Sequence, residues 1–232
     1  MDLRPIERSR RSFMDTYATM RATAMAKAFF EEPIPLDHDY FGESEEFVTF
    51  GTKEGECSFT EMMDSWIEFF YHFDRYARPY PFSSVDLGLW SVSSEVRDLL
   101  GFLVRDPVRA CALFSAMPRM FSDYFIEARD VPETGFHMWW DLLEWEAKRL
   151  EQAEFEANGT TTIRDAHLAA LEVILAIDDD HCQYCALHGL GHLEHPRRPE
   201  VVTAFIERER KGGKLHEWSL EWLEECRDGT VM

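Results

Sequence analysis

The sequence predicts an all-α protein built from stacked antiparallel helical hairpins, in the manner of an α-solenoid. Three observations carry this prediction. Apolar residues recur at helical spacing along most of the 232 residues, and helix caps and prolines recur between those stretches. Strand-like alternation is convincing only at residues 46–50. Short connections between the helices favour antiparallel neighbours, so we expect a single domain over residues 1–232.

The N-terminal part, residues 1–80, is expected to hold irregularly arranged helices. An amphipathic helix is predicted over residues 6–31, followed by a loop-like stretch from Pro33 to Cys57. Ser58 and Glu61 then form a capping-box pattern, which predicts a helix that continues to about residue 77.

From residue 81 to 232, the positions of helix-capping residues and prolines indicate helical hairpins. Ser94 is the predicted start of a helix that continues to Val104. Asp106 and Pro107 predict the N-cap and first position of the next helix, which Pro118 is expected to break. Helices are then expected up to residue 129, over residues 135–157, and over residues 163–177, the last apolar almost all round and therefore buried.

The last third of the chain has the clearest signals. The acidic run at residues 178–180 places negative charge at the N-terminus of a helix predicted over residues 181–195. Pro199 is expected to open the next helix. Two glycines at 212–213 mark the turn into a final helix that contains Leu215, Trp218, Trp222 and Cys226, and Gly229 is the expected stop.

Residues 179–206 resemble a HEAT-type repeat of the lyase-like kind, in which an aspartate precedes an Ala-Leu-rich first helix and a proline opens the second. Asp180 and Pro199 occupy those two positions, and the matching small and apolar positions are Ala186, Leu187, Leu190, Gly191, Leu193, Val201, Val202, Phe205 and Ile206. Residues 106–113 also match residues 180–187 at an aspartate, a cysteine, an alanine and a leucine. The resemblance implies HEAT-like hairpins over residues 81–232 and a surface that binds another macromolecule.

Histidines are concentrated in the predicted helix at residues 181–195, HCQYCALHGLGHLEH. At about 100° per residue, one arc of roughly 80° contains His181, Cys185, His188, His192 and His195, which we call the histidine stripe. Leucines 187, 190 and 193 fall on the opposite side. We therefore expect the leucines to anchor the helix and the stripe to face water or a cleft. Together with Asp180 and Glu194, the stripe is the candidate binding surface.

A metal site is the alternative interpretation of these histidines. His188 and His192 are one helical turn apart and could chelate one ion, and a transition metal such as zinc needs three or four ligands. The pair is similar to the HxxxH motif of the DNA-damage-inducible four-helix metalloproteins. That resemblance implies a third histidine from another helix, for which His72 is the candidate. No catalytic signature is complete, because His188-Gly-Leu-Gly-His192 lacks the glutamate of a zinc-protease motif.

The net charge limits the classes of partner that the chain can bind. The chain has 24 basic and 44 acidic residues, a net charge of -20, which opposes binding to nucleic-acid backbones and anionic lipid headgroups. A basic protein or a cation is the partner that this charge favours. No apolar run is long enough for a membrane span, and five cysteines without an export signal predict reduced thiols in the cytoplasm.

We therefore expect a non-catalytic helical-repeat protein that binds another macromolecule, a protein in particular, and that needs no cofactor. The alternative is a metal-binding protein or metal-dependent enzyme centred on His188 and His192. A third interpretation is an acidic inhibitor or immunity-type protein that shields a basic toxin.

Overall fold

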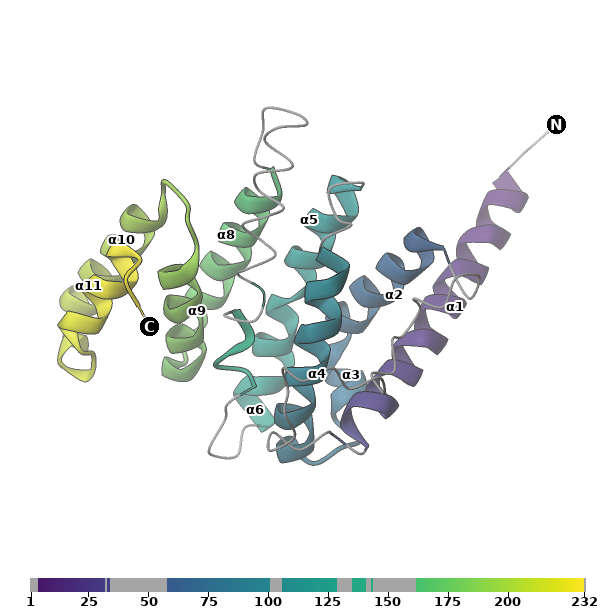
Figure 1. Cartoon of the computed structure of the whole chain (residues 1–232), viewed down its shortest axis with the longest axis horizontal. Helices are drawn as coiled ribbons and strands as arrows, with labels where there is room; N and C mark the ends of the chain where they lie inside the picture. The colour runs from purple at the N-terminus through teal and green to yellow at the C-terminus, as the bar shows by residue number, and fades with distance from the viewer. Residues whose placement is uncertain are drawn as a thin grey trace.

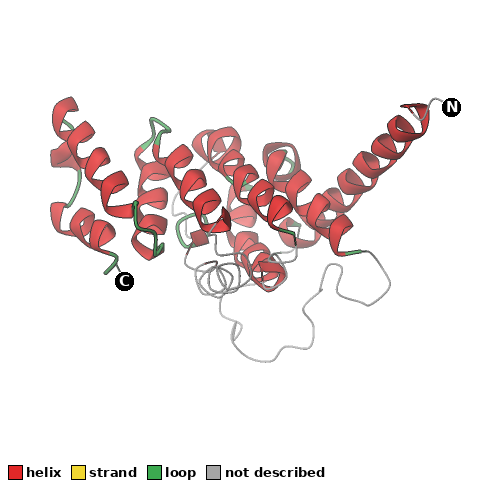
Figure 2. Ribbon diagram, turned by 90° about the horizontal axis from the view of Figure 1, so that it is seen from above, coloured by secondary structure: helices red, strands yellow, loops and turns green. Residues whose placement is uncertain are grey.

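The structure is a computed structural model that describes residues 4–31, 33, 58–100, 106–128, 135–140, 143 and 162–231. All regular secondary structure in these ranges is helical, which confirms the predicted all-α class, and none of them contains a strand (Figure 2). The strand-like residues 46–50 and most of the helix predicted over residues 135–157 lie outside the described residues.

The helices follow the capping and proline signals of the sequence closely. They are α1 (Arg4–Phe30), α2 (Phe59–Tyr71), α3 (Phe73–Ala77), α4 (Phe82–Leu100), α5 (Pro107–Ala116), α6 (Ile126–Ala128), α8 (Thr162–Leu175), α9 (Asp180–His192), α10 (Arg198–Gly212) and α11 (Leu220–Asp228). A π-helical turn occupies Met120–Phe125, and a 3-10 turn occupies Leu215–Glu217.

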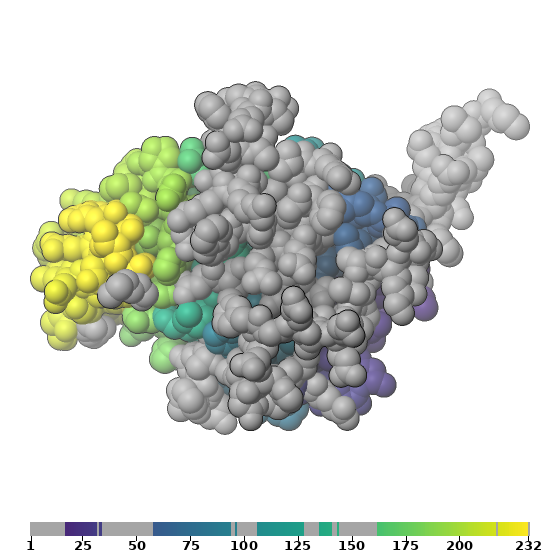
Figure 3. Space-filling view, viewed as in Figure 1, coloured from purple at the N-terminus to yellow at the C-terminus, as the bar shows by residue number. Residues whose placement is uncertain are grey.

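The helices lie in a row along the long axis of the molecule, with α1 at one end and α10 and α11 at the other (Figure 1). Contacts run from α1 to α2, from α2 to α5, from α5 to α8, from α8 to α9 and from α9 to α11. The space-filling view shows the C-terminal helices forming one end of the molecule (Figure 3). One continuous cluster of buried apolar side chains extends from Ala22 to Val231, so the expected N-terminal and hairpin parts share a core.

Three predicted helix boundaries are confirmed in atomic detail. The Ser58 hydroxyl accepts the backbone N–H of Glu61 at 3.2 Å, and the Glu61 carboxylate accepts the backbone N–H of Ser58 at 2.7 Å. Asp106 caps α5 by accepting the backbone N–H of Arg109 at 3.1 Å, with proline at the first position. Gly229 ends α11 with a φ of 73°, a left-handed conformation that glycine adopts without strain.

One expectation for the middle of the chain is wrong. Helix α4 begins at Phe82, well before Ser94, because Val85, Leu89 and Val92 are fully buried and this burial outweighs the weak helix propensity of the intervening serines. The expected break at Pro118 is confirmed, because α5 ends at Ala116 and a new helical stretch begins at the proline. Met117 and Arg119 keep right-handed helical dihedrals across this break, and a π-helical turn follows it.

Three expectations for the last third also need correction. Helix α8 is not buried all round, because Val173 is 55% exposed on its outer side. Helix α9 ends at His192, and Leu193 is already extended, so His195 lies beyond the helix. Helix α11 begins only at Leu220, because the Ser219 hydroxyl accepts the backbone N–H of Trp222 and so fixes the start of the helix there.

Among the described residues, no helix is both long enough and apolar enough to cross a lipid bilayer.

A candidate binding pocket between α9 and α11

A pocket of about 630 Å³ opens between α9 and the start of α11. We call it the aromatic pocket. Its volume falls in the range of about 300–1,000 Å³ that is typical of ligand sites. Its walls are formed by His137, Asp180, His181, Tyr184, Cys185, Trp218, Ser219 and Trp222.

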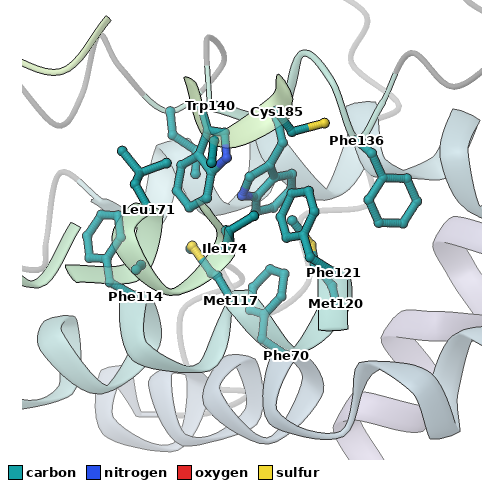
Figure 4. Close-up of a cluster of buried hydrophobic side chains, with 14 of the residues drawn as sticks. Phe70, Phe114, Met117, Met120, Phe121, Phe136, Trp140, Leu171, Ile174 and Cys185 are labelled. Carbon is teal, nitrogen blue, oxygen red and sulfur yellow. The ribbon is translucent and has the colours of Figure 1, made fainter. Parts of the chain in front are cut away.

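The first wall comes from the N-terminal half of α9. Tyr184 follows Asp180 by one helical turn, so these two share a side of α9, and Cys185 lines the pocket from the adjacent side of the helix. Asp179 fixes this end of the helix by accepting the backbone N–H of Cys182 at 3.0 Å. The Tyr184 side chain is 40% exposed, whereas Cys185 is buried in the floor beside the core (Figure 4).

The second wall consists of the two indoles that flank Ser219. The Trp222 ring stacks on Tyr184 with centroids 4.3 Å apart and planes within 11°. Trp218 lies nearly parallel to Trp222 at 6.4 Å, and its other contact is an edge-to-face packing with Phe205 of α10 at 5.1 Å. Aromatic contacts of this kind hold ring orientations tightly, so the indole wall is preorganised.

The third wall is His137, which a short segment at residues 135–140 places against α9. The backbone N–H groups of Gly135 and Phe136 donate to one carboxylate oxygen of buried Asp86, at 2.9 and 3.2 Å. Further along the segment, Trp140 packs into the buried cluster (Figure 4). Held at both ends, the segment places the His137 ring 4.7 Å from that of Tyr184, in a stacked arrangement.

His137 also changes the environment of the histidine stripe. Its ring lies 4.6 Å from that of His188, and His188 contacts His192 at 4.8 Å. His188 is only 5% exposed as a result, while His181 is exposed and His192 is half-buried. The expectation that the stripe faces water or a cleft is therefore wrong for His188 and His195, which are both buried, whereas Cys185 is buried but lines the aromatic pocket. Contact of His137 with α9 is the physical reason for the burial of His188.

His195 lies beyond the end of α9, where its ring has a structural role. Its Nε2 lies 2.9 Å from an Asp165 carboxylate oxygen on α8, and its Nδ1 accepts the backbone N–H of Arg197 at 3.1 Å. The ring therefore ties the α9–α10 turn to α8. Glu194 is exposed beside it, and the Glu194 carbonyl oxygen accepts a hydrogen bond from Arg164 at 3.0 Å. Neither side chain lines the aromatic pocket.

The expected third metal ligand does not join the histidine pair. His72 caps the C-terminus of α2, where its Nε2 lies 3.8 Å from a Glu68 carboxylate oxygen. Within the described ranges, no three or more His, Cys, Asp or Glu side chains are arranged to hold a metal ion.

The Cys226 thiol and the Tyr184 phenol, which lie near the aromatic pocket, are neutral groups. None of Cys111, Cys182, Cys185 and Cys226 forms a disulfide within the described residues. Burial raises the pKa of the Cys226 thiol to about 12. Burial, with smaller contributions from Cys226 and Cys185, also raises the pKa of Tyr184. The side chain of Tyr184 is therefore uncharged at neutral pH.

Both glycines of the histidine motif serve helix packing. A Cβ atom at Gly189 would lie 2.7 Å from Cγ of Trp140 and 2.9 Å from Cδ2 of Leu171, and one at Gly191 would overlap Val231. His167 is likewise a core residue, as its place on an apolar helix indicates, because its ring is 4.9 Å from Phe114 and 5.0 Å from Trp140.

Sequence reasoning places Asp180, His181 and Cys185 on the candidate surface, and the pocket brings these three together. It missed His137, Tyr184 and the two tryptophans. The four-residue spacing of Trp218 and Trp222 was visible as a helical pattern, yet such a pattern is equally typical of core packing. His137 carries no local signal, because only the tertiary fold brings it to α9.

Comparison with known proteins adds no relative, since no family model, curated protein or solved structure matches the chain.

Proposed function

We propose that this chain is a non-catalytic, HEAT-like helical protein that binds another protein through the aromatic pocket. Two observations support the HEAT-like part of the proposal. Each helix in the row contacts the next, and the sequence pattern of residues 179–206 resembles a repeat. Arrays of this kind offer extended surfaces on which a partner can lie.

The observation that carries the proposal is the composition of the pocket walls. Tyrosine and tryptophan are the residues that most often dominate the binding energy of protein interfaces, and here Tyr184, Trp218 and Trp222 line one opening. Leu220 adds an apolar side chain, 51% exposed, immediately after the pocket residue Ser219. A cluster of aromatic and aliphatic surface within a polar surrounding is typical of a docking site.

Charge selects the kind of partner. With a net charge of -20, the chain repels phosphate backbones and attracts basic proteins. An acidic inhibitor of a basic toxin is one form that such a protein could take. We therefore propose that the partner presents a basic protein surface and is not a nucleic acid.

Position-specific photo-crosslinking tests the proposal. A photoreactive residue at Leu220 lies beside the pocket without replacing one of its walls, and the same residue at Val108, 79% exposed on α5, is the matched control. We expect a protein adduct in cell extract from position 220 that position 108 does not give. The adduct should disappear when Tyr184→Leu is added. Equal adducts from both positions, or an adduct that Tyr184→Leu leaves unchanged, would contradict docking at the pocket.

A metal-dependent function is the second candidate, and one observation favours it. His137 adds a third imidazole beside the His188–His192 pair, because its ring lies 4.6 Å from that of His188, which in turn lies 4.8 Å from that of His192. These rings would have to turn to share an ion. Metal analysis of protein purified without a histidine tag tests this candidate, since stoichiometric zinc that is lost in a His188→Ala/His192→Ala variant would establish it.

A further inference from the structure

We propose that the aromatic pocket receives the ammonium group of a lysine side chain from a basic protein partner. This inference rests on the proposed function and specifies the chemical group that the pocket recognises. Three properties of the described residues carry it: the aromatic faces of the walls, the position of the single carboxylate, and the dimensions of the pocket.

The aromatic walls provide π faces for a cation. Ammonium groups are attracted to the face of an aromatic ring within about 6 Å of its centroid, and tryptophan is the strongest partner. Trp218 and Trp222 line the pocket as nearly parallel rings, with planes within 9° of each other. Tyr184 is neutral, and its ring is stacked between His137 at 4.7 Å and Trp222 at 4.3 Å, so it holds Trp222 in place while the two tryptophans supply the π faces.

Asp180 supplies the one fixed charge among the lining residues, and this charge is negative. It lies one helical turn before Tyr184, so the carboxylate and the phenol ring occupy the same side of α9. The neighbouring Asp178 has a different environment. Its side chain is 96% exposed and lies 3.7 Å from the ammonium group of Lys214. The chain thus offers an acidic residue in the pocket and a nearby one outside it.

The size of the pocket suits a side chain that enters from a partner. At about 630 Å³ it exceeds the volume of a single ammonium group, so it has room for the methylene stem of lysine against the apolar walls. Such a stem would pack on Trp222 while the ammonium group remains near Asp180. Lysine therefore fits both the apolar and the charged parts of the walls.

Titration with two matched peptides, followed by NMR, tests the inference on the full chain. The first is acetyl-Gly-Gly-Lys-Gly-Gly-amide, and the second is the same peptide with the lysine Nε acetylated. Acetylation removes the charge and keeps the stem. We expect side-chain proton resonances of the lysine peptide to shift upfield near the aromatic rings, and its affinity to exceed that of the acetylated peptide by at least about tenfold.

Three variants assign the effect to residues. Asp180→Asn is expected to weaken binding of the lysine peptide by about three- to tenfold, whereas Asp178→Asn changes it by less than about twofold, because that carboxylate lies outside the pocket. Tyr184→Leu keeps apolar volume but removes the ring on which Trp222 stacks, and should abolish the preference for the charged peptide because the indole wall is no longer held in place. Tyr184→Phe retains the ring and should preserve that preference.

The outcomes separate this inference from the proposed function. Equal affinity for the two peptides, or no binding of either, overturns the lysine inference even when crosslinking at position 220 captures a partner. Tighter binding of choline than of the lysine peptide also overturns it, because the source of the cation would then be a small quaternary amine. Failure of position 220 in the otherwise unchanged chain to give an adduct, while the lysine peptide still binds, counts against the proposed function and not against the lysine inference.

Discussion

Gly189→Ala measures how tightly the 135–140 segment is packed on α9. Alanine is favoured over glycine inside a helix by about 1 kcal/mol, so the substitution would stabilise an exposed site. At Gly189, however, the added Cβ would lie 2.7 Å from Trp140 Cγ, against a usual carbon–carbon separation of about 3.5–4.0 Å. Trp140 cannot easily move, because its ring stacks on His167 at 5.0 Å.

Overpacking of this kind costs about 1–3 kcal/mol. Subtraction of the gain in helix propensity leaves about 0–2 kcal/mol. Because both neighbours are buried, we expect Gly189→Ala to lower the free energy of unfolding by an amount in the upper half of this range, about 1–2 kcal/mol. Gly212→Ala is the matched control. Gly212 is also helical, and nothing lies within 4 Å of its added Cβ.

Urea unfolding of the two variants provides the assay. Each substitution changes the entropy of the unfolded chain in the same way, so their difference reports packing in the folded state. Gly212→Ala should be neutral or stabilising by a few tenths of a kcal/mol, up to about 1 kcal/mol. A Gly189→Ala protein as stable as Gly212→Ala would refute the packing of Trp140 on α9, and with it the placement of the His137 wall.

Two further outcomes follow from other contacts. Asp106→Ala should lower the free energy of unfolding by about 1 kcal/mol at neutral pH, while Asp106→Asn, which can still cap α5, should lose less. Hydrogen bonds from Arg109 lower the pKa of Asp106, so the ionised side chain stabilises the fold above its unfolded-state pKa. In an acid titration, the difference in stability between wild type and Asp106→Asn should therefore vanish as the pH falls through the folded-state pKa. His195→Ala should cost about 1–2 kcal/mol in urea unfolding, because two hydrogen bonds are lost, yet leave lysine-peptide affinity unchanged.

Each of these predictions has a clear contrary result. Equal stability of Asp106→Ala and wild type at neutral pH would contradict the capping contact. Reduced peptide affinity in His195→Ala would place that ring in the site and not in the α8 contact.

The fold was predictable wherever local chemistry decides the outcome. Capping by Ser58 and Asp106 and the stop at Gly229 involve atoms within a few residues of each other, so the sequence pattern is sufficient. The start of α4 was not predictable in this way. Residues 82–93 are helical because Val85, Leu89 and Val92 are buried against other helices, and that burial is a tertiary event.

The candidate site was predictable in part for the same reason. Helical periodicity correctly places His181 and Cys185 on one face of α9 and the leucines on the other, and Asp180 lines the pocket beside His181. Helical periodicity does not predict which other segment of the chain packs on a given face of a helix. Asp86 positions the 135–140 segment from a helix that is distant in sequence, and the segment then buries His188.

Direct measurement of partner affinity tests the central claim, that the aromatic pocket is the docking site. Once crosslinking has identified the partner, its dissociation constant can be compared for wild type, Tyr184→Leu and the control Tyr71→Leu, which replaces a similarly exposed tyrosine on α2. Loss of an aromatic anchor at an interface costs about 2 kcal/mol or more, so Tyr184→Leu should weaken binding at least about thirtyfold. Tyr71→Leu should leave the affinity unchanged. Equal affinities for all three proteins would contradict the claim.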